Sequence, residues 1–149
     1  MATAYHPAVE IIALGPGDAD KVLAAGHLFD NEPKADATAR FLAEPGHHLL
    51  FAYDDGVAVG FISGVETTHP DKGTEMFLYE LSVAEARRRH GIGGDLVKCL
   101  SEIARSRGCY GMWVGTEPTN VSALATYQHS GATRDEDHTI ILSWHFEEG

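Results

Sequence analysis

Short runs of alternating apolar and polar residues in the front half of the chain predict β-strands. His47–Tyr53 and Val57–Thr68 flank the turn Asp54-Asp55-Gly56, and Asp-Gly tolerates the positive φ of a tight hairpin turn. After a loop at His69–Gly73, Glu75–Val83 continues the pattern as a third, longer strand. The front half therefore predicts a hairpin-rich, antiparallel sheet.

One strand and two helices are expected before this hairpin. The strand covers Val9–Leu14. Asp18 or Asp20 can cap a helix that runs to about Phe29, because a carboxylate there accepts hydrogen bonds from the free N–H groups of the first turn. A second, short helix covers Ala35–Ala43.

Helices and strands alternate in the back half. The expected elements are a helix that opens at Arg87–Gly94 and ends at Gly108, a strand at Tyr110–Gly115, a helix from Pro118–Asn120 to Ser130-Gly131, and a last strand at Thr139–Phe146. A hairpin-rich front followed by a β-α-β unit predicts a single mixed α/β (α+β) domain over residues 1–149, rather than a doubly wound parallel sheet.

The chain carries twice as many acidic as basic residues. Among 149 residues, 22 Asp and Glu against 11 Lys and Arg give a formal net charge of -11 at pH 7. Nucleic acids and anionic membranes reward a basic surface, so the charge speaks against both as partners. It leaves open solubility alone or the binding of a cationic partner.

Cysteine and histidine patterns predict neither a disulfide framework nor a metal site. Cys99 and Cys109 are too few for a framework, and their spacing matches no common zinc pattern. His47 and His48 would point to opposite faces of a strand, and the nine histidines include no His-x-x-x-His pair. Without a signal-like N-terminus, we expect a reducing, cytoplasmic compartment.

The segment Val83–Leu96 is the best candidate for binding chemistry. Gly91, Gly93 and Gly94 lie where a helix begins, directly after the arginines Arg87–Arg89. Glycine lets backbone N–H groups approach a ligand, and a helix N-terminus favours negative charge, so the pattern indicates a phosphate site. It fits neither a Walker loop nor a dinucleotide fingerprint. The alternative is a solvated turn.

Two motifs resemble the GCN5-related N-acetyltransferase (GNAT) superfamily. Arg88-Arg89-His90-Gly91-Ile92-Gly93 matches that family's phosphate-loop signature, Arg/Gln-x-x-Gly-x-Gly/Ala after the fourth strand. The family's later signature is an Asn that opens a helix and a Tyr before the Gly that ends it. Asn120, Tyr127 and Gly131 match those positions.

The resemblance implies a mixed, mostly antiparallel sheet flanked by helices, with splayed fourth and fifth strands. It implies acetyl-CoA as the acetyl donor and a homodimer. In that arrangement Leu81, Ser82 and Val83 run beside the pantetheine arm, and the backbone of Leu81 and Val83 pairs with it. The pyrophosphate lies on a loop made of Arg88, Arg89, His90, Gly91, Ile92, Gly93 and Gly94.

Glu80 is the candidate general base. It interrupts the apolar strand FLYELSV, and we expect its side chain on the face shared by Met76, Leu78 and Ser82. A carboxylate inside such a strand is costly to bury unless it is paired or functional. A role in deprotonating or binding the acceptor amine therefore competes with a simple ion pair to an arginine.

Tyr127 and Asn120 take their expected roles from the resemblance. Tyr127 matches the general acid that protonates the departing CoA thiolate, with plain core packing as the alternative. Asn120 is explained as a helix N-cap, and a contact to the cofactor is possible in addition.

The acceptor is expected to be a cationic amine. Tyr79–Val97 looks most like the aminoglycoside 3-N-acetyltransferases of the type I group, so the resemblance implies 3-N-acetylation and antibiotic resistance. Candidate substrate carboxylates are Asp30, Glu32, Glu80, Asp135, Glu136 and Asp137. The alternatives are another amine (a polyamine, an amino sugar, a protein N-terminus or a lysine) or a non-catalytic acyl-CoA-binding module.

Overall fold

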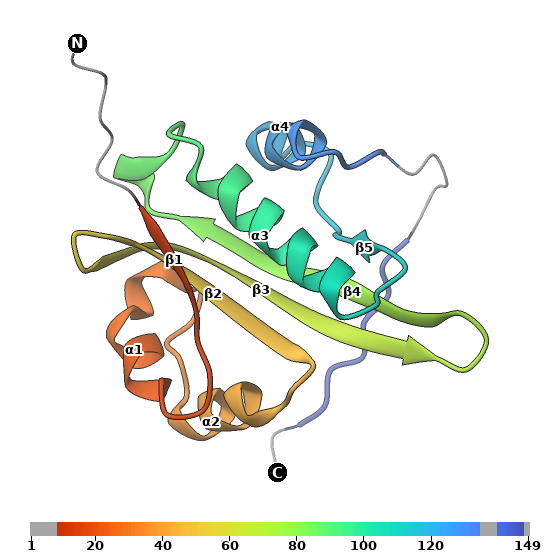
Figure 1. Cartoon of the computed structure of the whole chain (residues 1–149), viewed down its shortest axis with the longest axis horizontal. Helices are drawn as coiled ribbons and strands as arrows, with labels where there is room; N and C mark the ends of the chain where they lie inside the picture. The colour runs from red at the N-terminus through yellow and green to blue at the C-terminus, as the bar shows by residue number, and fades with distance from the viewer. Residues whose placement is uncertain (1–8, 135–139, 148–149) are drawn as a thin grey trace.

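The fold is a five-stranded sheet with helices on both faces (Figure 1). The computed structural model describes residues 9–134 and 140–147. The strands lie in the order β1-β2-β3-β4-β5, antiparallel except for the parallel pair β4 and β5. The elements are β1 (Glu10–Ala13), α1 (Ala19–Ala24), the 3-10 turn η1 (Gly26–Leu28), α2 (Ala35–Ala43), β2 (His47–Asp54), β3 (Val57–His69), β4 (Gly73–Val83), the 3-10 turn η2 (Glu85–Arg87), α3 (Ile92–Ser106), β5 (Met112–Trp113) and α4 (Val121–His129). The expected mixed, mostly antiparallel α+β fold is confirmed.

The β2–β3 hairpin forms as its sequence predicts. Asp54 pairs with Val57 across the turn. Asp55 and Gly56 both adopt positive φ, at 50° and 77°, which is the backbone of a type I′ turn and matches the right-handed twist of the strands.

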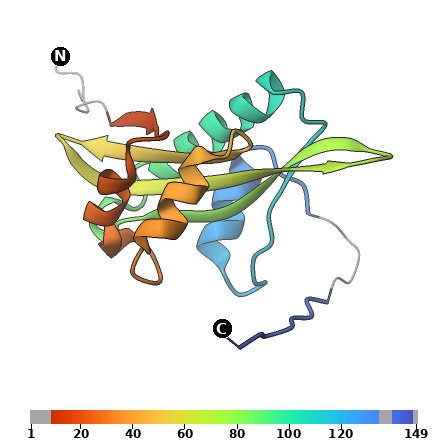
Figure 2. The same cartoon turned by 90° about the horizontal axis from the view of Figure 1, so that it is seen from below.

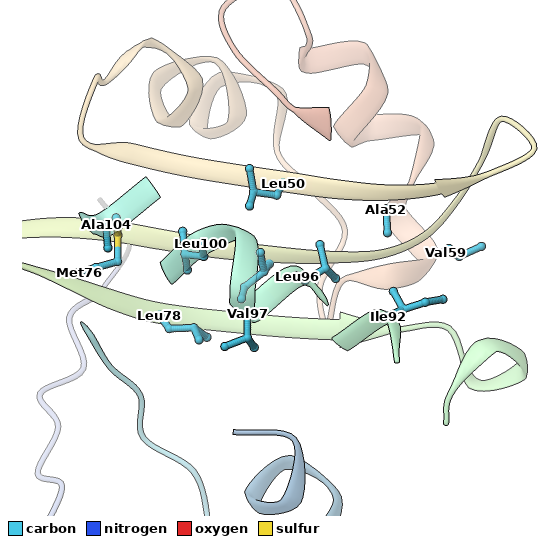
Figure 3. Close-up of a cluster of buried hydrophobic side chains, with 11 residues drawn as sticks. Leu50, Ala52, Val59, Met76, Leu78, Ile92, Leu96, Val97, Leu100 and Ala104 are labelled. Atoms are coloured by element: carbon cyan, nitrogen blue, oxygen red, sulfur yellow. The ribbon is translucent and has the colours of Figure 1, made fainter. Parts of the chain in front are cut away.

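Two apolar layers hold the sheet between its helices. Helix α3 packs on one face through Leu96, Val97 and Leu100, and its first residue, Ile92, is also buried (Figure 3). The opposite face is covered by α1, η1 and α2, around Phe51 and the other residues of a second buried cluster. We call these the α3 face and the α1 face.

A glycine in β3 makes room for side chains of α3 and β4. A Cβ at Gly64 would lie 2.9 Å from both δ-methyl carbons of Leu100 and 3.0 Å from the sulfur of Met76. Since real Cβ atoms essentially never approach so closely, a side chain at position 64 would force the side chains of Leu100 and Met76 to shift.

The first helical region is shorter than expected. Asp18 is the N-cap residue, but its carboxylate accepts a hydrogen bond from the N–H of Gly15 at 2.8 Å instead of from the first turn of the helix. Helix α1 ends at Ala24 and the chain tightens into η1 rather than continuing to Phe29. Gly26 disfavours a helix interior, and Ser82 Oγ donates to the carbonyl oxygen of Leu28 at 2.7 Å.

Two predicted strands differ from the structure, because one is shorter than expected and the other does not form in its described residues. The strand expected at Tyr110–Gly115 contracts to β5, Met112–Trp113. Of the last expected strand, Thr139–Phe146, Thr139 lies outside the described residues, and residues 140–146 form no strand. An alternating pattern makes a strand only when a neighbour pairs with its backbone, and this segment finds no such neighbour in the described part of its own chain.

A carboxylate ties the C-terminal end of α3 to the sheet. His48 Nε2 donates to Glu66 Oε2 at 2.7 Å, and Arg107 Nε donates to the same oxygen. Burial alone would raise the pKa of Glu66, but these hydrogen bonds outweigh burial and hold the pKa below its usual range.

None of the helices in the described part of the chain has the length and apolar character needed to span a membrane.

Glu66→Gln is expected to lower the free energy of unfolding at pH 7 by about 1–2 kcal/mol, because a hydrogen-bonded charge is lost. A lowered pKa stabilises the fold above the carboxyl's unfolded pKa, and this contribution disappears as pH falls through the folded pKa. The gap between variant and wild type should therefore close in acid. Urea unfolding across pH measures it, with the exposed Asp71→Asn as control. A gap independent of pH would contradict the assignment.

Candidate active site

A β-bulge in β4 decides where Glu80 points. Ser63 pairs with Glu80 and Gly64 pairs with Leu78, so Tyr79 is the extra residue of β4. One added residue reverses the alternation of side chains beyond it. The Glu80 backbone N–H also donates to the buried Ser63 Oγ at 3.2 Å, which holds the bulge in place.

The bulge corrects the expected face of Glu80. Met76 and Leu78 lie in the cluster on the α3 face. Beyond Tyr79, Leu81 and Val83 pack on that face, while Ser82 bonds to η1 on the α1 face. Glu80 therefore shares its face with Ser82 as expected, but not with Met76 and Leu78, because period-two counting does not anticipate an inserted residue.

Glu80 lines a hollow of about 390 Å³ together with residues that follow η1. We call it the Glu80 hollow; its lining is Phe29, Asp30, Asn31, Tyr79 and Glu80. The segment is anchored by the bond from Ser82 to Leu28 and by Phe29, which stacks on Phe61 with ring centroids 4.2 Å apart. These contacts set Asp30 opposite β4.

The hollow contains two carboxylates, those of Asp30 and Glu80. Burial raises the pKa of Glu80, and the negative charge of Asp30 raises it further. Among the expected substrate carboxylates, Asp30 and Glu80 thus come together. Glu32 is exposed and does not line the hollow. Asp135, Glu136 and Asp137 lie outside the described residues.

On the other side of β4, half of the strand lacks a β-strand neighbour. Pairing with β5 is confined to Met76 with Met112 and Phe77 with Trp113, so the described part of the chain provides no strand beside Leu78–Val83 on this edge. The expected splay of the fourth and fifth strands is present. Backbone groups on such an edge need partners, although the carbonyl oxygen of Val83 accepts a hydrogen bond from Arg88 Nε at 3.1 Å.

The glycine-rich segment forms a tight entrance to α3. Arg89 and Gly91 adopt positive φ, at 69° and 81°, and α3 begins at Ile92. The first N–H groups of this 15-residue helix have no partner within the helix, which makes its N-terminus suited to an anion. A Cβ at Gly93 would lie 3.4 Å from Thr126 Cγ2 of α4, so a small residue lets the two helices meet there.

One arginine of the segment forms an ion pair within the fold, and the other two are exposed to solvent. Arg87 forms an ion pair with Asp54 of the β2–β3 hairpin. Arg88 and Arg89 are exposed, as is His90. Ile92, by contrast, is buried in the α3-face cluster, so only its backbone is available to a ligand.

Helix α4 brings Tyr127 to the α3 face. Asn120 caps this helix, since its Oδ1 accepts a hydrogen bond from the N–H of Ala123 at 3.1 Å. Tyr127 packs against the α3-face cluster, and burial raises the pKa of its hydroxyl. Glu80 and Tyr127 therefore approach β4 from opposite faces.

Among the described residues, no group of three or more His, Cys, Asp or Glu is arranged to hold a metal ion.

These features match a known family. The model of the acetyltransferase (GNAT) family matches residues 20–132. This chain belongs to the GNAT family. The match spans the Glu80 hollow, the splayed strands, the glycine-rich segment and α4, so all the described candidate residues lie inside it.

Two individual relatives match more than half of this chain. The mouse (Mus musculus) probable N-acetyltransferase family 8 member 5 is 29% identical over 113 residues, covering 74% of this chain and 49% of that protein. The aminoglycoside N(6')-acetyltransferase type 1 of Klebsiella aerogenes is 30% identical over 95 residues, covering 62% of each. This chain spans about half the length of the family 8 relatives it matches.

A solved structure extends the likeness over nearly the whole chain. An aminoglycoside acetyltransferase from an uncultured soil metagenomic sample superposes with a TM-score of 0.77 at 26% identity, covering 92% of this chain and 99% of that one. The resemblance to the 3-N type I group is not confirmed, because the matched Klebsiella aerogenes enzyme is named for the N(6') position.

Gly91→Val is expected to weaken acetyl-CoA binding at least tenfold, because the positive φ at the start of α3 aims the N–H groups. Gly108→Val is the matched control, since Gly108 lies just beyond the other end of α3 with φ 82° and equally open space. Both variants should lose about 1–3 kcal/mol of stability through backbone strain. Calorimetric titration with acetyl-CoA separates them, and equal affinity in the two variants would contradict a donor site at Gly91.

Proposed function

We propose that the chain is an acetyl-CoA-dependent N-acetyltransferase that acetylates an amino group of a cationic small molecule, with an aminoglycoside as the favoured acceptor. The observation that carries this proposal is the pair Asp30 and Glu80 in one hollow, beside a half-strand of β4 that pairs with β3 on one edge and with no strand of the described chain on the other. One side of β4 is suited to a cation, and the other to an extended donor molecule.

The donor side fits acetyl-CoA in two respects. The N-terminus of α3 and the exposed Arg88 and Arg89 suit its pyrophosphate. The open edge of β4 at Leu81 and Val83 suits its pantetheine arm, whose amides can pair with backbone as an added strand does. In this assignment the donor is bordered by Ser82, His90, Gly93, Gly94 and Asn120. The hydroxyl of Ser82 bonds to η1, and the side chain of Asn120 caps α4.

Glu80 acts as the base for the acceptor amine, directly or through a water molecule. Its raised pKa makes the carboxylate a stronger proton acceptor than an ordinary glutamate. The acceptor nitrogen attacks as a neutral amine, after its ammonium form has released a proton to solvent, and it loses one further proton to Glu80 as it forms the new bond to the acetyl carbon. Asp30 remains to hold the positive charge of the acceptor.

Tyr127 acts as the acid for the leaving group. Acetyl-CoA supplies a thioester whose carbon–sulfur bond breaks as the amide forms. Because burial raises the pKa of Tyr127, its hydroxyl stays protonated at neutral pH and can give its proton to the departing sulfur. Solvent returns that proton and removes the one on Glu80, which restores both groups.

The acidic surplus supports a polycationic acceptor. A net charge of -11 attracts cations over long range, and the paired carboxylates of the hollow attract them at short range. The resemblance of Tyr79–Val97 to the 3-N type I group favours the 3-amino position. The relative named for the N(6') position makes the 6' amine the alternative.

Thiol release from acetyl-CoA is expected to be fastest with an aminoglycoside such as gentamicin, slower with spermidine and slowest with peptide amines. Two carboxylates held in a small hollow bind a rigid polycation more tightly than a flexible or singly charged amine. NMR of the product identifies the acetylated nitrogen, and a sensitive host expressing the chain should gain resistance. Acetyl-CoA binding without turnover of any of these amines would refute the proposed enzymatic activity and would favour an acyl-CoA-binding module instead.

Glu80→Gln is expected to lower kcat by about 10²–10⁴-fold with little change in acetyl-CoA affinity, as expected for loss of a general base. In the wild type, kcat/KM should rise with pH as Glu80 loses its proton, and this limb should vanish in Glu80→Gln. Asp30→Asn should shift the limb to lower pH, because the charge that raises the pKa of Glu80 is gone. Glu32→Gln, outside the hollow, is the control. An unchanged limb in Glu80→Gln would exclude Glu80 as the base.

A further inference from the structure

The α1 face of β4 is open along much of the strand. None of the residues that form the α1-face cluster belongs to β4, because α1, η1 and α2 pack on the neighbouring strands. Met76 and Leu78 point into the α3-face cluster. By the alternation of a strand and the bulge that follows it, the open face carries the side chains between and beyond them, namely Glu75, Phe77, Tyr79 and Glu80.

Three aromatic side chains form a continuous strip on this face, and the strip begins at the Glu80 hollow. Tyr79 lines the hollow and is 64% exposed. Its ring meets that of Phe77 edge to face, with centroids 5.7 Å apart, and Phe77 stacks on Trp113 of β5 at 4.3 Å. Trp113 is 50% exposed. We call these three residues the aromatic strip. Exposed aromatic faces attract ammonium groups and the apolar faces of other rings.

A second carboxylate lies at the far end of the aromatic strip. Glu75 precedes Phe77 on the same face of β4, where the β3–β4 hairpin extends beyond α1 and α2 (Figure 2). One oxygen of Glu75 accepts a hydrogen bond from the hydroxyl of Tyr110 at 2.8 Å, and the other accepts one from His69 Nε2 at 3.1 Å. These bonds hold the pKa of Glu75 below its usual range, so the group is ionised at neutral pH.

Glu75 is held in place and still has room for a cation. A carboxylate offers roughly four acceptor positions, and the side chain of Glu75 is 21% exposed. Glu75 and Glu80 are five positions apart in β4, and one of the steps between them is the bulge. At the rise of a β-strand their spacing is roughly 13–17 Å. The two carboxylates therefore lie at opposite ends of one aromatic surface.

We propose that the aromatic strip and Glu75 form a second acceptor subsite, which makes the chain selective for a long, rigid polycation. This inference rests on the proposed function, in which the reacting amine lies between Asp30 and Glu80. The next ring of the acceptor lies with its apolar face on the strip, and an ammonium group at its far end binds Glu75. The acceptor class is thus a chain of linked rings with amines at both ends.

Each part of this surface disfavours another class of amine. A singly charged amine gains from only one of the two carboxylates. A diamine built on a single ring is too short to reach from Glu80 to Glu75. A flexible polyamine such as spermidine is long enough, but it has no ring to lie on the aromatic strip and loses conformational freedom when it is held straight.

Calorimetric titration of the full chain tests the proposal through binding, so the result does not depend on turnover. Gentamicin can reach both subsites, whereas 2-deoxystreptamine, its central ring alone, can reach only one. Glu75→Gln is expected to weaken gentamicin binding about tenfold, as for loss of a hydrogen bond to a charged group, and to leave 2-deoxystreptamine binding unchanged. Asp71→Asn is the control, because it removes one negative charge from the same hairpin at an exposed carboxylate paired with Lys72.

The fluorescence of Trp113 reports directly whether the aromatic strip is occupied. The chain has two tryptophans, so Trp144→Phe leaves Trp113 as the only one. In this variant the free chain should emit at the long wavelength of a water-exposed indole. Gentamicin should change this emission, and 2-deoxystreptamine should leave it unchanged.

Several results would overturn the subsite. They are an unchanged gentamicin affinity in Glu75→Gln, an equal loss of affinity for both ligands, which would indicate a structural role for Glu75, and Trp113 emission that gentamicin does not alter. A short-wavelength emission in the free chain would show that protein covers the strip instead. Failure of the proposed function looks different: gentamicin then binds with the expected dependence on Glu75 but is not acetylated.

Discussion

The single inserted residue in β4 is the constraint on which the site depends. Because Tyr79 breaks the alternation, Met76 and Leu78 face the core under α3 while Glu80 faces η1. A regular strand would have aimed Glu80 into an apolar layer, where an unpaired carboxylate costs several kcal/mol. The bulge instead places it in a hollow with Asp30, and the hydrogen bond from the Glu80 backbone to Ser63 Oγ holds this geometry.

The splay of β4 and β5 completes the arrangement on the other edge. Pairing that ends after Phe77 and Trp113 leaves the half-strand up to Val83 without a strand of the described chain on the edge opposite to β3. The same half-strand carries Glu80 and leads into the entrance of α3. One stretch of β4 thus links an acidic hollow, an open backbone edge and a helix N-terminus within a few residues.

Sequence patterns predicted those parts of the fold that local chemistry determines. The Asp-Gly turn, the residues of α2, the start of α3 after glycine and the Asn120 cap all depend on near neighbours in the chain, and each is confirmed. The candidate residues Asp30 and Glu80, which are 50 positions apart, were chosen for their charge, and only the fold shows that they meet.

What could not be predicted depends on distant partners. The bulge could not be predicted from the segment FLYELSV because it is caused by pairing with Ser63 and Gly64 on another strand. The strand predicted at Thr139–Phe146 failed in residues 140–146 for the same reason: alternation describes a surface, while a strand also requires a backbone beside it. The role of Tyr127 rests on family resemblance, whereas the glycine-rich segment indicated a phosphate site from its own residues and takes only the identity of its ligand from the resemblance.

The separation of the two faces of β4 has a consequence for how this protein can diversify. The Glu80 hollow is built from the few residues after η1, on the face opposite to α3 and α4. Substitutions at Asn31 or its neighbours can reshape that hollow without disturbing the packing of Gly64 against Leu100 or of Gly93 against α4. Under the proposed assignment of the hollow to the acceptor, acceptor preference can therefore change without altering the side of β4 assigned to the donor.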